Sequence, residues 1–291
     1  MSDLNVMLSA NIVRMSSAVR WAFNWKEWNP SEREFEHATS CVQSDEKERL
    51  KRFVFRKDVR ASLVGRLLMR KFVNEYAGLP YDKITFVRDE NNRPVLKDNS
   101  TLVNFNVSHQ GSYTVLAGEI KNVKIGVDVM TLEYNEGKNI SEFFRLMNKH
   151  FSAAEWDEIG GSGKSGAEQM AMFFRHWALK ESYVKALGVG VFVDLGSIDF
   201  RTNSKLSADS ITTDTVLHVN GIKQDWLFEE TLLDSRHCVA VALQENDNSL
   251  RLRSNTLFEI MNYDKLVAHA VPLFPIDPQY TIQYFAKYEQ P

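Results

Sequence analysis

The chain has 291 residues, of which 44% are hydrophobic and 25% are charged. This composition is ordinary for a globular protein and excludes a largely disordered chain. Lys and Arg number 35 and Asp and Glu number 38, so the formal net charge of −3 argues against a chain that coats nucleic acid or membranes. Two cysteines, Cys41 and Cys238, exclude a disulfide framework and a multi-cysteine zinc site.

The length predicts roughly two domains, at about 150 residues per domain. The first ten residues have no basic start and no apolar run, so no secretory signal is expected. The sequence also lacks the roughly 18 consecutive apolar residues of a membrane-spanning helix. These features, together with the few cysteines, predict a cytosolic protein with free thiols and no membrane partner.

The first half of the chain is predicted to form a strand, three helices and several short strands. Alternating aromatic residues predict a strand with one packed face within residues 13–28, and Asn29 or Ser31 is expected to cap the next helix. Further helices are predicted near residues 44–55 and over residues 58–76. Strands are then predicted at residues 84–87, 94–96, 105–107, 113–117 and 125–129.

The second half repeats this order of elements. Helices are predicted at residues 142–150, 153–159 and 168–187, and strands at 198–200, 216–219, 226–228 and 238–243. The repetition indicates an α+β fold of two similar lobes related by pseudo-twofold symmetry, each a mostly antiparallel sheet with a packed helix. We predict an N-terminal lobe over residues 1–122 and a C-terminal lobe over 123–245, with a linker and a docked apolar segment over 246–291.

The strongest chemical signal is a pair of acids, Asp128 and Glu181, 53 residues apart. Asp128 ends a predicted strand two residues after Gly126, which would allow close approach of a ligand or backbone. Glu181 shares a helix face with apolar residues, so its carboxylate needs a cation, a proton or a donor, and Lys185 lies one turn further on. Two converging carboxylates would suit Mg²⁺. The plain structural alternative is an Asp in a turn and a Glu–Lys helix pair.

Two sequence blocks resemble the signature of the 4′-phosphopantetheinyl transferases. They are IGVDV at residues 125–129 and WALKESYVKA at residues 177–186, and their separation also fits. The upstream blocks NRPVL at 92–96 and NFNVSHQG at 104–111 resemble the large, monomeric, two-lobed members of this family. The resemblance covers about residues 19–285. It departs at Asn92, where the family often has Gly, although Asn tolerates the positive φ that Gly would supply.

The resemblance implies a two-lobed transferase fold with coenzyme A in the cleft between the lobes. Such enzymes move the 4′-phosphopantetheine arm of coenzyme A to a serine of apo acyl or peptidyl carrier proteins and release adenosine 3′,5′-bisphosphate. Asp128 and Glu181 would hold Mg²⁺, or Mn²⁺ in its place. Glu181 is also the candidate general base for the carrier serine, and Lys185 would neutralise charge on the phosphate.

The resemblance also implies coenzyme-binding residues in the N-terminal half. Arg49 would contact the 3′-phosphate. The adenine and ribose phosphate would be cradled by Arg88, Asp89, Glu90, Asn91, Asn92 and Arg93, for which a plain β-turn is the structural alternative. Phosphate contacts are expected from Asn106, Val107, Ser108 and His109. A lone His is more often structural, and the surrounding block favours the phosphate contact.

Residues 47–71 are strongly basic, with ten Lys or Arg and two acids, a local charge of +8. We expect most of these side chains to form a solvated helix face. The alternative function is nucleic-acid binding through this segment, with Phe53, Phe55 and Phe72 as stacking residues. A non-catalytic carrier-binding module is a further alternative, which the intact set of Asp128, Glu181 and Lys185 disfavours.

Met130 stands where many bacterial relatives have a third acid. It lies two residues after Asp128, so both side chains would point to the same side of a strand. Met130 is then expected either to face the metal region or to turn into the core. In either case the metal site has two carboxylate ligands, because a thioether is a poor ligand for Mg²⁺.

Overall fold

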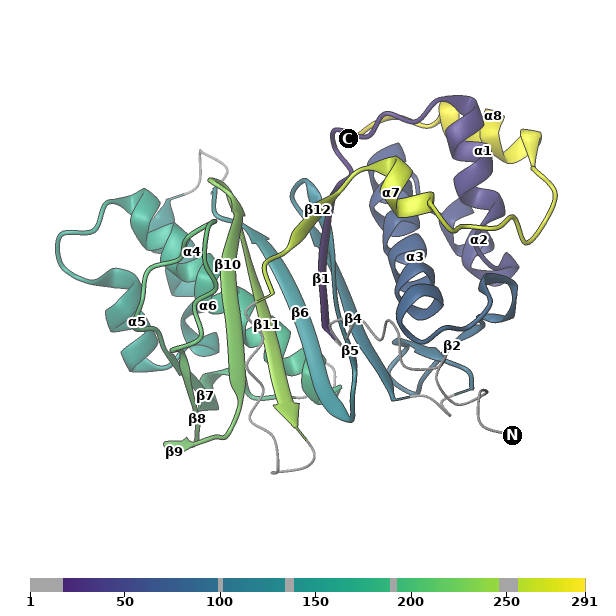
Figure 1. Ribbon diagram of the computed structural model, residues 1–291. Helices are drawn as coiled ribbons and strands as arrows, with labels where there is room; N and C mark the ends of the chain where they lie inside the picture. Colours follow the sequence, from purple (N-terminus) through teal and green to yellow (C-terminus); the bar gives the residue numbers. More distant parts are fainter. Residues whose placement is uncertain (1–17, 99–101, 134–138, 189–192, 246–255, 291) are drawn as a thin grey trace, which may run out of the picture.

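A computed structural model describes residues 18–98, 102–133, 139–188, 193–245 and 256–290 of the chain. Helices and strands alternate in an α+β arrangement, with the strands in the middle and helices at both ends (Figure 1). The helices are α1 (Glu32–Ser40), α2 (Ser44–Lys51), α3 (Arg56–Tyr76), α4 (Ile140–Met147), α5 (Ala153–Gly160), α6 (Gly166–Leu187), α7 (Tyr263–Val267) and α8 (Pro278–Ala286), with short 3₁₀ turns at Tyr81–Lys83, Asn148–His150 and Leu195–Ser197.

The strands form two larger sheets and two small ones. They are β1 (Ala18–Asn24), β2 (Phe86–Arg88), β3 (Pro94–Leu96), β4 (Val103–Gln110), β5 (Tyr113–Ile120), β6 (Val123–Thr131), β7 (Ile198–Arg201), β8 (Val216–Val219), β9 (Ile222–Lys223), β10 (Leu227–Asp234), β11 (His237–Glu245) and β12 (Glu259–Met261). The larger sheets have the orders β12-β1-β5-β4 and β10-β11-β6, and the small ones are β2-β3 and β7-β8-β9.

The two larger sheets repeat one strand order. In the N-terminal lobe β5 lies between β1 and β4, and in the C-terminal lobe β11 lies between β6 and β10; all four pairings are antiparallel. In chain order each lobe runs strand, helices, small sheet and hairpin. This confirms the predicted α+β fold with two mostly antiparallel sheets. The edge strand β12 departs from the repeat, because it pairs with β1 in parallel.

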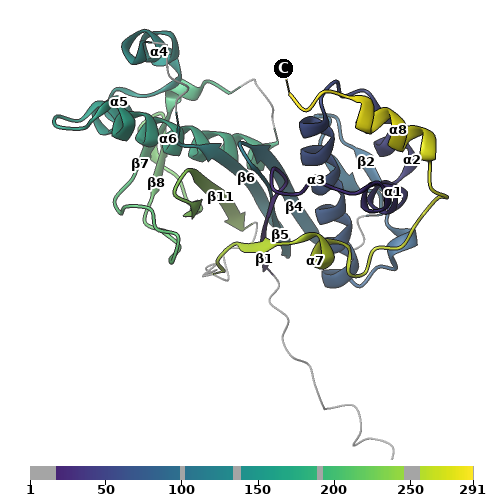
Figure 2. The same cartoon turned by 90° about the horizontal axis from the view of Figure 1, so that it is seen from above.

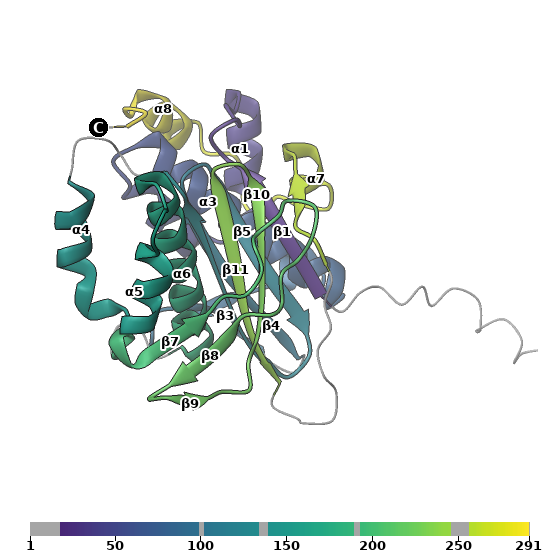
Figure 3. The same cartoon turned by 90° about the vertical axis from the view of Figure 1, so that its left-hand side faces the viewer.

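The two sheets face each other through a shared core. It contains Ala22 of β1, and alternate residues of β5, β6 and β11 such as Val115, Val127 and Val241, all fully buried. The helices lie on the outer sides of this pair of sheets, α6 against β6 and β11 and α3 beyond β4 and β5 (Figure 2). Figure 3 shows α5, α6 and the β7-β8-β9 sheet from the side of the C-terminal lobe. Strands β4 and β6, one from each sheet, come together here, and the predicted site residues Ser108 and Asp128 lie on these two strands.

Burial corrects the prediction for the first strand. We expected one packed face, but residues 19–23 are all buried, because one face of β1 meets the second sheet and the other meets α3. Trp21 packs edge-on against Phe72 and Tyr76 of α3. The helix that follows begins at Ser31, which forms a capping box with Glu34. The part of the predicted strand before residue 18 lies outside the described residues, as do residues 1–10.

We had expected the basic segment 47–71 to form a solvated helix face, but the structure does not show one. Lys47, Arg60, Arg70 and Lys71 are all buried, and of the ten basic residues only Arg52 is fully exposed. Other residues of the chain neutralise these charges. For example, Asp277 forms an ion pair with Lys47, and Glu289 forms one with Arg60. Phe72 is in the core and Phe53 packs against it, so two of the three rings named as stacking residues are engaged in packing, and Phe55 is half-buried.

The C-terminal segment lies on the N-terminal lobe. Beyond the parallel strand β12, the Tyr284 ring of α8 stacks on Phe35 of α1. The carbonyl of Tyr288 accepts a hydrogen bond from the first amide of α3, Arg56 N, at 2.9 Å. Helix α3 has no side-chain cap of its own, so the chain's end satisfies part of its N-terminus. The predicted linker at 246–253 lies outside the described residues. Among the described helices, none is long and apolar enough to cross a membrane.

Candidate active site

The predicted acid pair lies where helix α6 rests on strand β6. Gly126 makes this close approach possible, because a Cβ at this position would overlap the Ser182 carbonyl oxygen and the Ala186 nitrogen of α6. We had expected Gly126 to admit a ligand or a backbone, and the structure shows that it admits a backbone. The side chains of α6 that face β6 therefore lie directly over Asp128 of that strand.

Asp128 is buried, with 5% of its surface exposed, and shares its carboxylate with two neighbours. Its Oδ1 accepts hydrogen bonds from Ser108 Oγ at 2.7 Å and from Lys185 Nζ at 2.5 Å. Lys185 Nζ also donates to Ser108 Oγ at 2.9 Å. Lys185 thus pairs with Asp128 and not with Glu181, so the plain Glu–Lys helix pair is not what the structure contains.

Glu181 lies half-buried one turn before Lys185, with no hydrogen bond to any described residue. Burial raises the pKa of Glu181, and the nearby Asp128 carboxylate raises it further, while Lys185 opposes both. The other Asp128 oxygen, Oδ2, is buried and has no hydrogen-bond partner among the described residues. A buried orphan carboxylate oxygen beside a second carboxylate is an arrangement that a divalent cation would satisfy. The donor set, two hard oxygens, fits Mg²⁺ or Mn²⁺.

Met130 does not add a ligand to this pair. It is half-buried and packs against the apolar cluster that includes Leu179 and Tyr183 of α6. The described residues contain no group of three or more His, Cys, Asp or Glu side chains that could hold a metal. The two-carboxylate site stays a prediction.

A cavity of about 450 Å³ opens beside Glu181. Glu181 and Lys185 line it with apolar neighbours from α6 and the following loop, Trp177, Val184 and Leu195. Asn91 and Arg93 close it from the N-terminal lobe. The carboxylate of Glu181 therefore faces a space that residues of both lobes enclose.

The hairpin at residues 88–93 is a tight turn that reaches this cavity. Asp89 Oδ1 accepts from the backbone amides of Asn91 at 2.9 Å and Arg93 at 2.8 Å. Burial opposes ionisation of Asp89, but these amides and the Arg93 guanidinium lower its pKa. Asn92 has φ 62°, as predicted from its place in the motif. Glu90 is exposed at the tip.

Arg93 joins the hairpin to the C-terminal lobe. Its Nε donates to Asp89 Oδ2 at 2.8 Å and its Nη1 donates to the Lys185 carbonyl at 3.3 Å. A Cβ on Gly188, which ends α6 at φ 70°, would overlap this guanidinium. Gly188 is thus the predicted C-cap; Val189 and Gly190 lie outside the described residues. The β-turn and a ligand-contacting role are compatible here.

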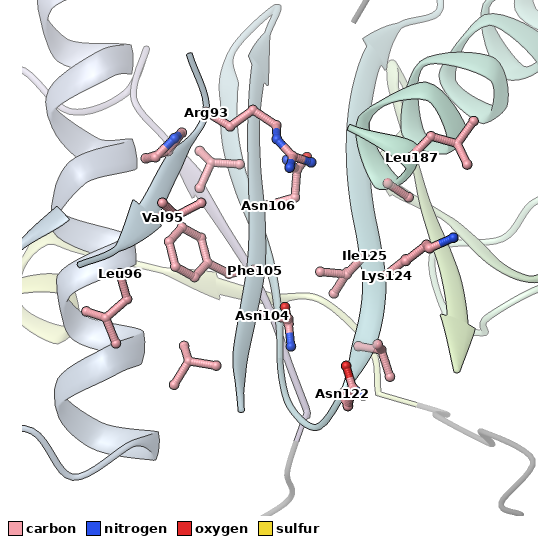
Figure 4. A pocket seen from close by; sticks show the side chains of 15 residues that line it. Arg93, Val95, Leu96, Asn104, Phe105, Asn106, Asn122, Lys124, Ile125 and Leu187 are labelled. Carbon is pink, nitrogen blue, oxygen red and sulfur yellow. The ribbon is translucent and has the colours of Figure 1, made fainter. Parts of the chain in front are cut away.

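Below Arg93 the groove between the lobes continues as a second cavity of about 340 Å³. Figure 4 shows Arg93 extending toward Asn106, with Phe105 of β4 and Ile125 of β6 further along the groove. Asn106 uses its side-chain oxygen to accept from the backbone amide of Val127 at 3.0 Å. It thereby joins β4 to β6, one strand from each lobe.

The remaining predicted residues of β4 divide into two groups. Ser108 is in the centre of the site, as described above. Val107 packs against the core of the N-terminal lobe and contributes no side-chain contact to the site. The His109 side chain keeps exposed surface, and desolvation of its ring by the surrounding protein, together with the nearby Lys185 cation, lowers its pKa. His109 is therefore neutral near pH 7 and close to Lys185.

Arg49 and Arg88 lie on the N-terminal lobe, around a buried acid. Glu46 forms ion pairs with Arg66 and with Arg88, the latter at 2.6 Å. Burial and the positive charges of Arg88 and Arg49 lower the pKa of Arg66. Arg49 is half-buried and is in no ion pair among the described residues. The arrangement leaves a positive rim on one side of the site.

Sequence reasoning missed several residues of this region. Arg66 was grouped with the basic segment, Glu46 was given no role, and Gln110 was quoted within a motif without a role. Gln110 Oε1 accepts from the backbone amide of Thr131 at 2.5 Å, next to Met130. The alternation of polar residues along residues 104–110 was the signal that could have identified these contacts.

Family models of known proteins match both halves of the chain. The family model described as 4′-phosphopantetheinyl transferase, N-terminal, matches residues 26–121, and that of the 4′-phosphopantetheinyl transferase superfamily matches residues 124–242. The predicted domain boundaries themselves stay a prediction.

Curated relatives cover nearly the whole chain. The chain is 39% identical over 286 residues to an L-aminoadipate-semialdehyde dehydrogenase-phosphopantetheinyl transferase of Xenopus laevis, covering 94% of each chain. It is 38% identical to the protein of that name from Homo sapiens, covering 92% of this chain and 91% of the relative. A 4′-phosphopantetheinyl transferase of Aneurinibacillus migulanus is 26% identical, over 78% of this chain and 87% of the relative. The chain therefore belongs to the 4′-phosphopantetheinyl transferase family and is an enzyme of that class.

Proposed function

We propose that this enzyme transfers the 4′-phosphopantetheine arm of coenzyme A to a serine of apo carrier proteins in a Mg²⁺-dependent reaction that releases adenosine 3′,5′-bisphosphate. The observation that carries the proposal is the buried Asp128 carboxylate, which is shared by Ser108 and Lys185 and has one free oxygen beside Glu181. Phosphoryl-type transfer depends mainly on positioning and on stabilising charge, and this cluster offers both.

Asp128 and Glu181 would hold the metal. A divalent cation bound there would supply Lewis-acid stabilisation of the negative charge on the coenzyme A phosphates. Asp128 is suited to the role because its Oδ1 is fixed by two donors, which leaves Oδ2 free. Burial, and then the nearby Asp128 carboxylate, raise the pKa of Glu181, and a cation bound between the two carboxylates would relieve their repulsion.

The chain's own residues would perform the proton transfer and hold the phosphate. Glu181 would accept the proton of the carrier serine, for which a raised pKa brings a carboxylate closer to neutral pH. Lys185, held by Ser108 and Asp128, would neutralise charge on the phosphate. Trp177 and Val184 would limit the access of water to Glu181.

The N-terminal lobe would bind the nucleotide end of coenzyme A. Arg49 is a cation without an ion-pair partner among the described residues, and we assign it to the 3′-phosphate. The turn at residues 88–93 would contact the adenine and ribose through its backbone and through Arg93. His109 would donate an N–H to a phosphate oxygen as a neutral imidazole.

We further propose a monomer in the cytosol, since one chain supplies both lobes of the site and both cysteines are unpaired and buried. The names of the relatives point to aminoadipate-semialdehyde dehydrogenase as one acceptor. Acyl carrier proteins of fatty acid synthesis form a second class of acceptor, and we expect no nucleic-acid partner.

Mass spectrometry of the acceptor tests this proposal. The enzyme is incubated with coenzyme A, Mg²⁺ and several apo carrier domains, and each carrier is weighed. We expect a gain of one phosphopantetheine group, lost when Mg²⁺ is chelated and when Asp128→Ala replaces the wild type. If no carrier of either class gains this mass, the proposed function is refuted.

A further inference from the structure

The strands β4 and β6 are joined by side chains in the part of the groove that forms the site. Alternate residues of β4 reach across to β6: Asn106 accepts from Val127 N, Ser108 donates to Asp128, and Gln110 accepts from Thr131 N. Residues two apart on a strand point to the same side, so these contacts form a ladder. Its middle rung is the Ser108–Asp128 hydrogen bond of the site.

The end of this ladder rests on a buried histidine. After Gln110 the chain turns at Gly111, which has φ 62°, and Ser112. A Cβ at Gly111 would overlap Thr131 Oγ1 and His237 Nε2, so the turn lies directly on the ends of β6 and β11. His237 is 2% exposed and pairs with Thr131 in the register of these strands.

The hydrogen bonds of His237 assign the tautomer of its neutral ring. Ser112 N is 3.2 Å from His237 Nε2, and because a backbone amide can only donate, Nε2 must be the acceptor. The proton of the neutral ring is then on Nδ1, which donates to Asp234 Oδ1 at 2.9 Å. Burial opposes ionisation of Asp234, but His237 and the turn amides lower its pKa.

We propose that Asp234 and His237 form a positioning pair for the transferase site: by holding Ser112 they set the β4–β5 turn against β6, and so place Ser108 on Asp128 and Lys185. This inference rests on the proposed function, because the reaction that the pair would assist is the proposed phosphopantetheine transfer. Neither side chain touches Asp128 or Lys185 directly, so the effect passes through the ladder. Outer partners of this kind typically change metal affinity or activity by about 10- to 100-fold when removed.

Two amide substitutions separate positioning from packing. In His237→Gln the side-chain amide oxygen reaches about where Nε2 lies and can accept from Ser112, whereas the shorter amide of His237→Asn reaches only the Nδ1 side. We expect His237→Asn to weaken binding of Mg²⁺–coenzyme A about ten-fold by calorimetry and to lower kcat. His237→Gln should restore most of both.

The matched control is His176→Gln. His176 is fully buried and pairs with Glu158, as His237 pairs with Asp234, but its polar partners, Glu158 and the Met172 carbonyl, lie outside the β4–β5 turn. It should lower the melting temperature without weakening binding of Mg²⁺–coenzyme A. Should His237→Asn fail to fold, Asp234→Ala takes its place, because it removes the acceptor that keeps the proton on Nδ1, and the same loss of affinity is expected.

The inference is overturned if His237→Asn binds Mg²⁺–coenzyme A like the wild type, or if His176→Gln loses as much affinity at an equal drop in melting temperature. A wild type that modifies no carrier refutes the proposed function and leaves the calorimetric comparison intact. An active wild type with an unaltered His237→Asn refutes the positioning pair alone.

Discussion

The two lobes share one strand order but place their long helices on different strands. Helix α6 lies over β6, the counterpart of β1, so closely that its backbone contacts Gly126, whereas α3 lies mainly over β4 and β5 and meets β1 through Trp21, which packs against Phe72 and Tyr76 of α3. The difference arises at Gly126, since a helix can approach β6 closely only where the strand has no side chain. One copy of the fold has thus kept an aromatic core, and the other brings charged residues of a helix onto a strand.

The charged helix pairs of the two lobes show the same contrast. In α3, Lys71 and Glu75 form an ion pair one turn apart and neutralise one another. In α6, Glu181 and Lys185 have the same spacing, but Lys185 turns to Asp128 at 2.5 Å and leaves Glu181 without an ion-pair partner in the described part of the chain. The same spacing therefore forms an ion pair on one helix and leaves the carboxylate that we propose as the base on the other.

The largest effect is expected for Glu181→Gln. The variant keeps the shape of the side chain and removes the proposed base, so turnover should fall by at least about 100-fold. The matched variant Glu75→Gln loses the ion pair with Lys71 and the contact with His269, both away from the site, and should keep full activity. Initial rates of carrier modification compare the two, and a Glu181→Gln enzyme with near-normal turnover would make Glu181 a plain residue of the helix face.

The stabilities of these two variants should change in opposite directions. The pKa of Glu181 is raised in the folded protein, so the folded state binds more protons and the free energy of unfolding falls as the pH rises through this window. Glu181→Gln removes that penalty and should raise the melting temperature at pH 8 by about 2 °C, with chelator present. The gain should shrink toward the ordinary pKa of glutamate. Glu75→Gln should show no gain at pH 8.

Substitution of the glycines under the two helices gives the next largest effect. An alanine at Gly126 would overlap the backbone of α6, so the helix must move away from β6; we expect a loss of about 1–3 kcal/mol and at least about ten-fold lower activity. In Gly65→Ala of α3 the new methyl group meets only side chains, Val107 Cγ1 at 3.2 Å and Thr114 Cγ2 at 3.6 Å. Its activity should be kept. Equal losses in both variants, measured by urea unfolding and by rate, would contradict the comparison.

Local sequence patterns predicted most of the helices and strands up to residue 245, but not β9 or the elements β12, α7 and α8 of the C-terminal segment. The capping residue Ser31, the C-cap Gly188 and the positive φ of Asn92 follow from local chemistry. The resemblance to a known family supplied Asp128, Glu181 and Lys185, and the structure brings them together. None of this required knowledge of distant contacts.

The rest depended on contacts between residues far apart in the chain. The partners of the basic segment, Asp277 and Glu289, come from the C-terminal end, so the sequence alone indicated exposed charge where the structure has buried ion pairs. His237 lies 125 residues from Ser112, and a single His beside an apolar strand gives no sign of its partner. Contacts between residues far apart in the chain are set by how the sheets and helices pack together, which local sequence patterns do not specify.

Arg49→Ala tests the division of labour between the lobes. If the N-terminal lobe binds the nucleotide end of coenzyme A, this variant should weaken the binding of coenzyme A about ten-fold, which corresponds to the loss of one charge-assisted hydrogen bond. Binding of 3′-dephospho-coenzyme A should change little. Arg52→Ala, an exposed basic residue of the same segment, is the control and should alter neither. Calorimetry with both compounds decides, and equal weakening of the two by Arg49→Ala would remove the 3′-phosphate assignment.

The smallest effect is expected at Met130, where the C-terminal lobe lacks a third acid. Met130 lies on the same side of β6 as Asp128 and is half-buried against the cluster under α6. A carboxylate in Met130→Glu that faced the metal would add a hard ligand and lower the Mg²⁺ and Mn²⁺ concentrations needed for half-maximal turnover. It would also add negative charge near the pyrophosphate, so kcat should fall slightly as metal affinity rises.

Met130→Gln separates the charge from the change of shape, because it brings a polar side chain of similar length without a carboxylate. Its metal dependence should equal that of the wild type, with a melting temperature close to that of Met130→Glu. An unchanged metal dependence in a folded Met130→Glu enzyme would show that residue 130 belongs to the packed face of β6. The site would then end at Asp128 along this strand, and the two carboxylates from β6 and α6 would be its full set of acids.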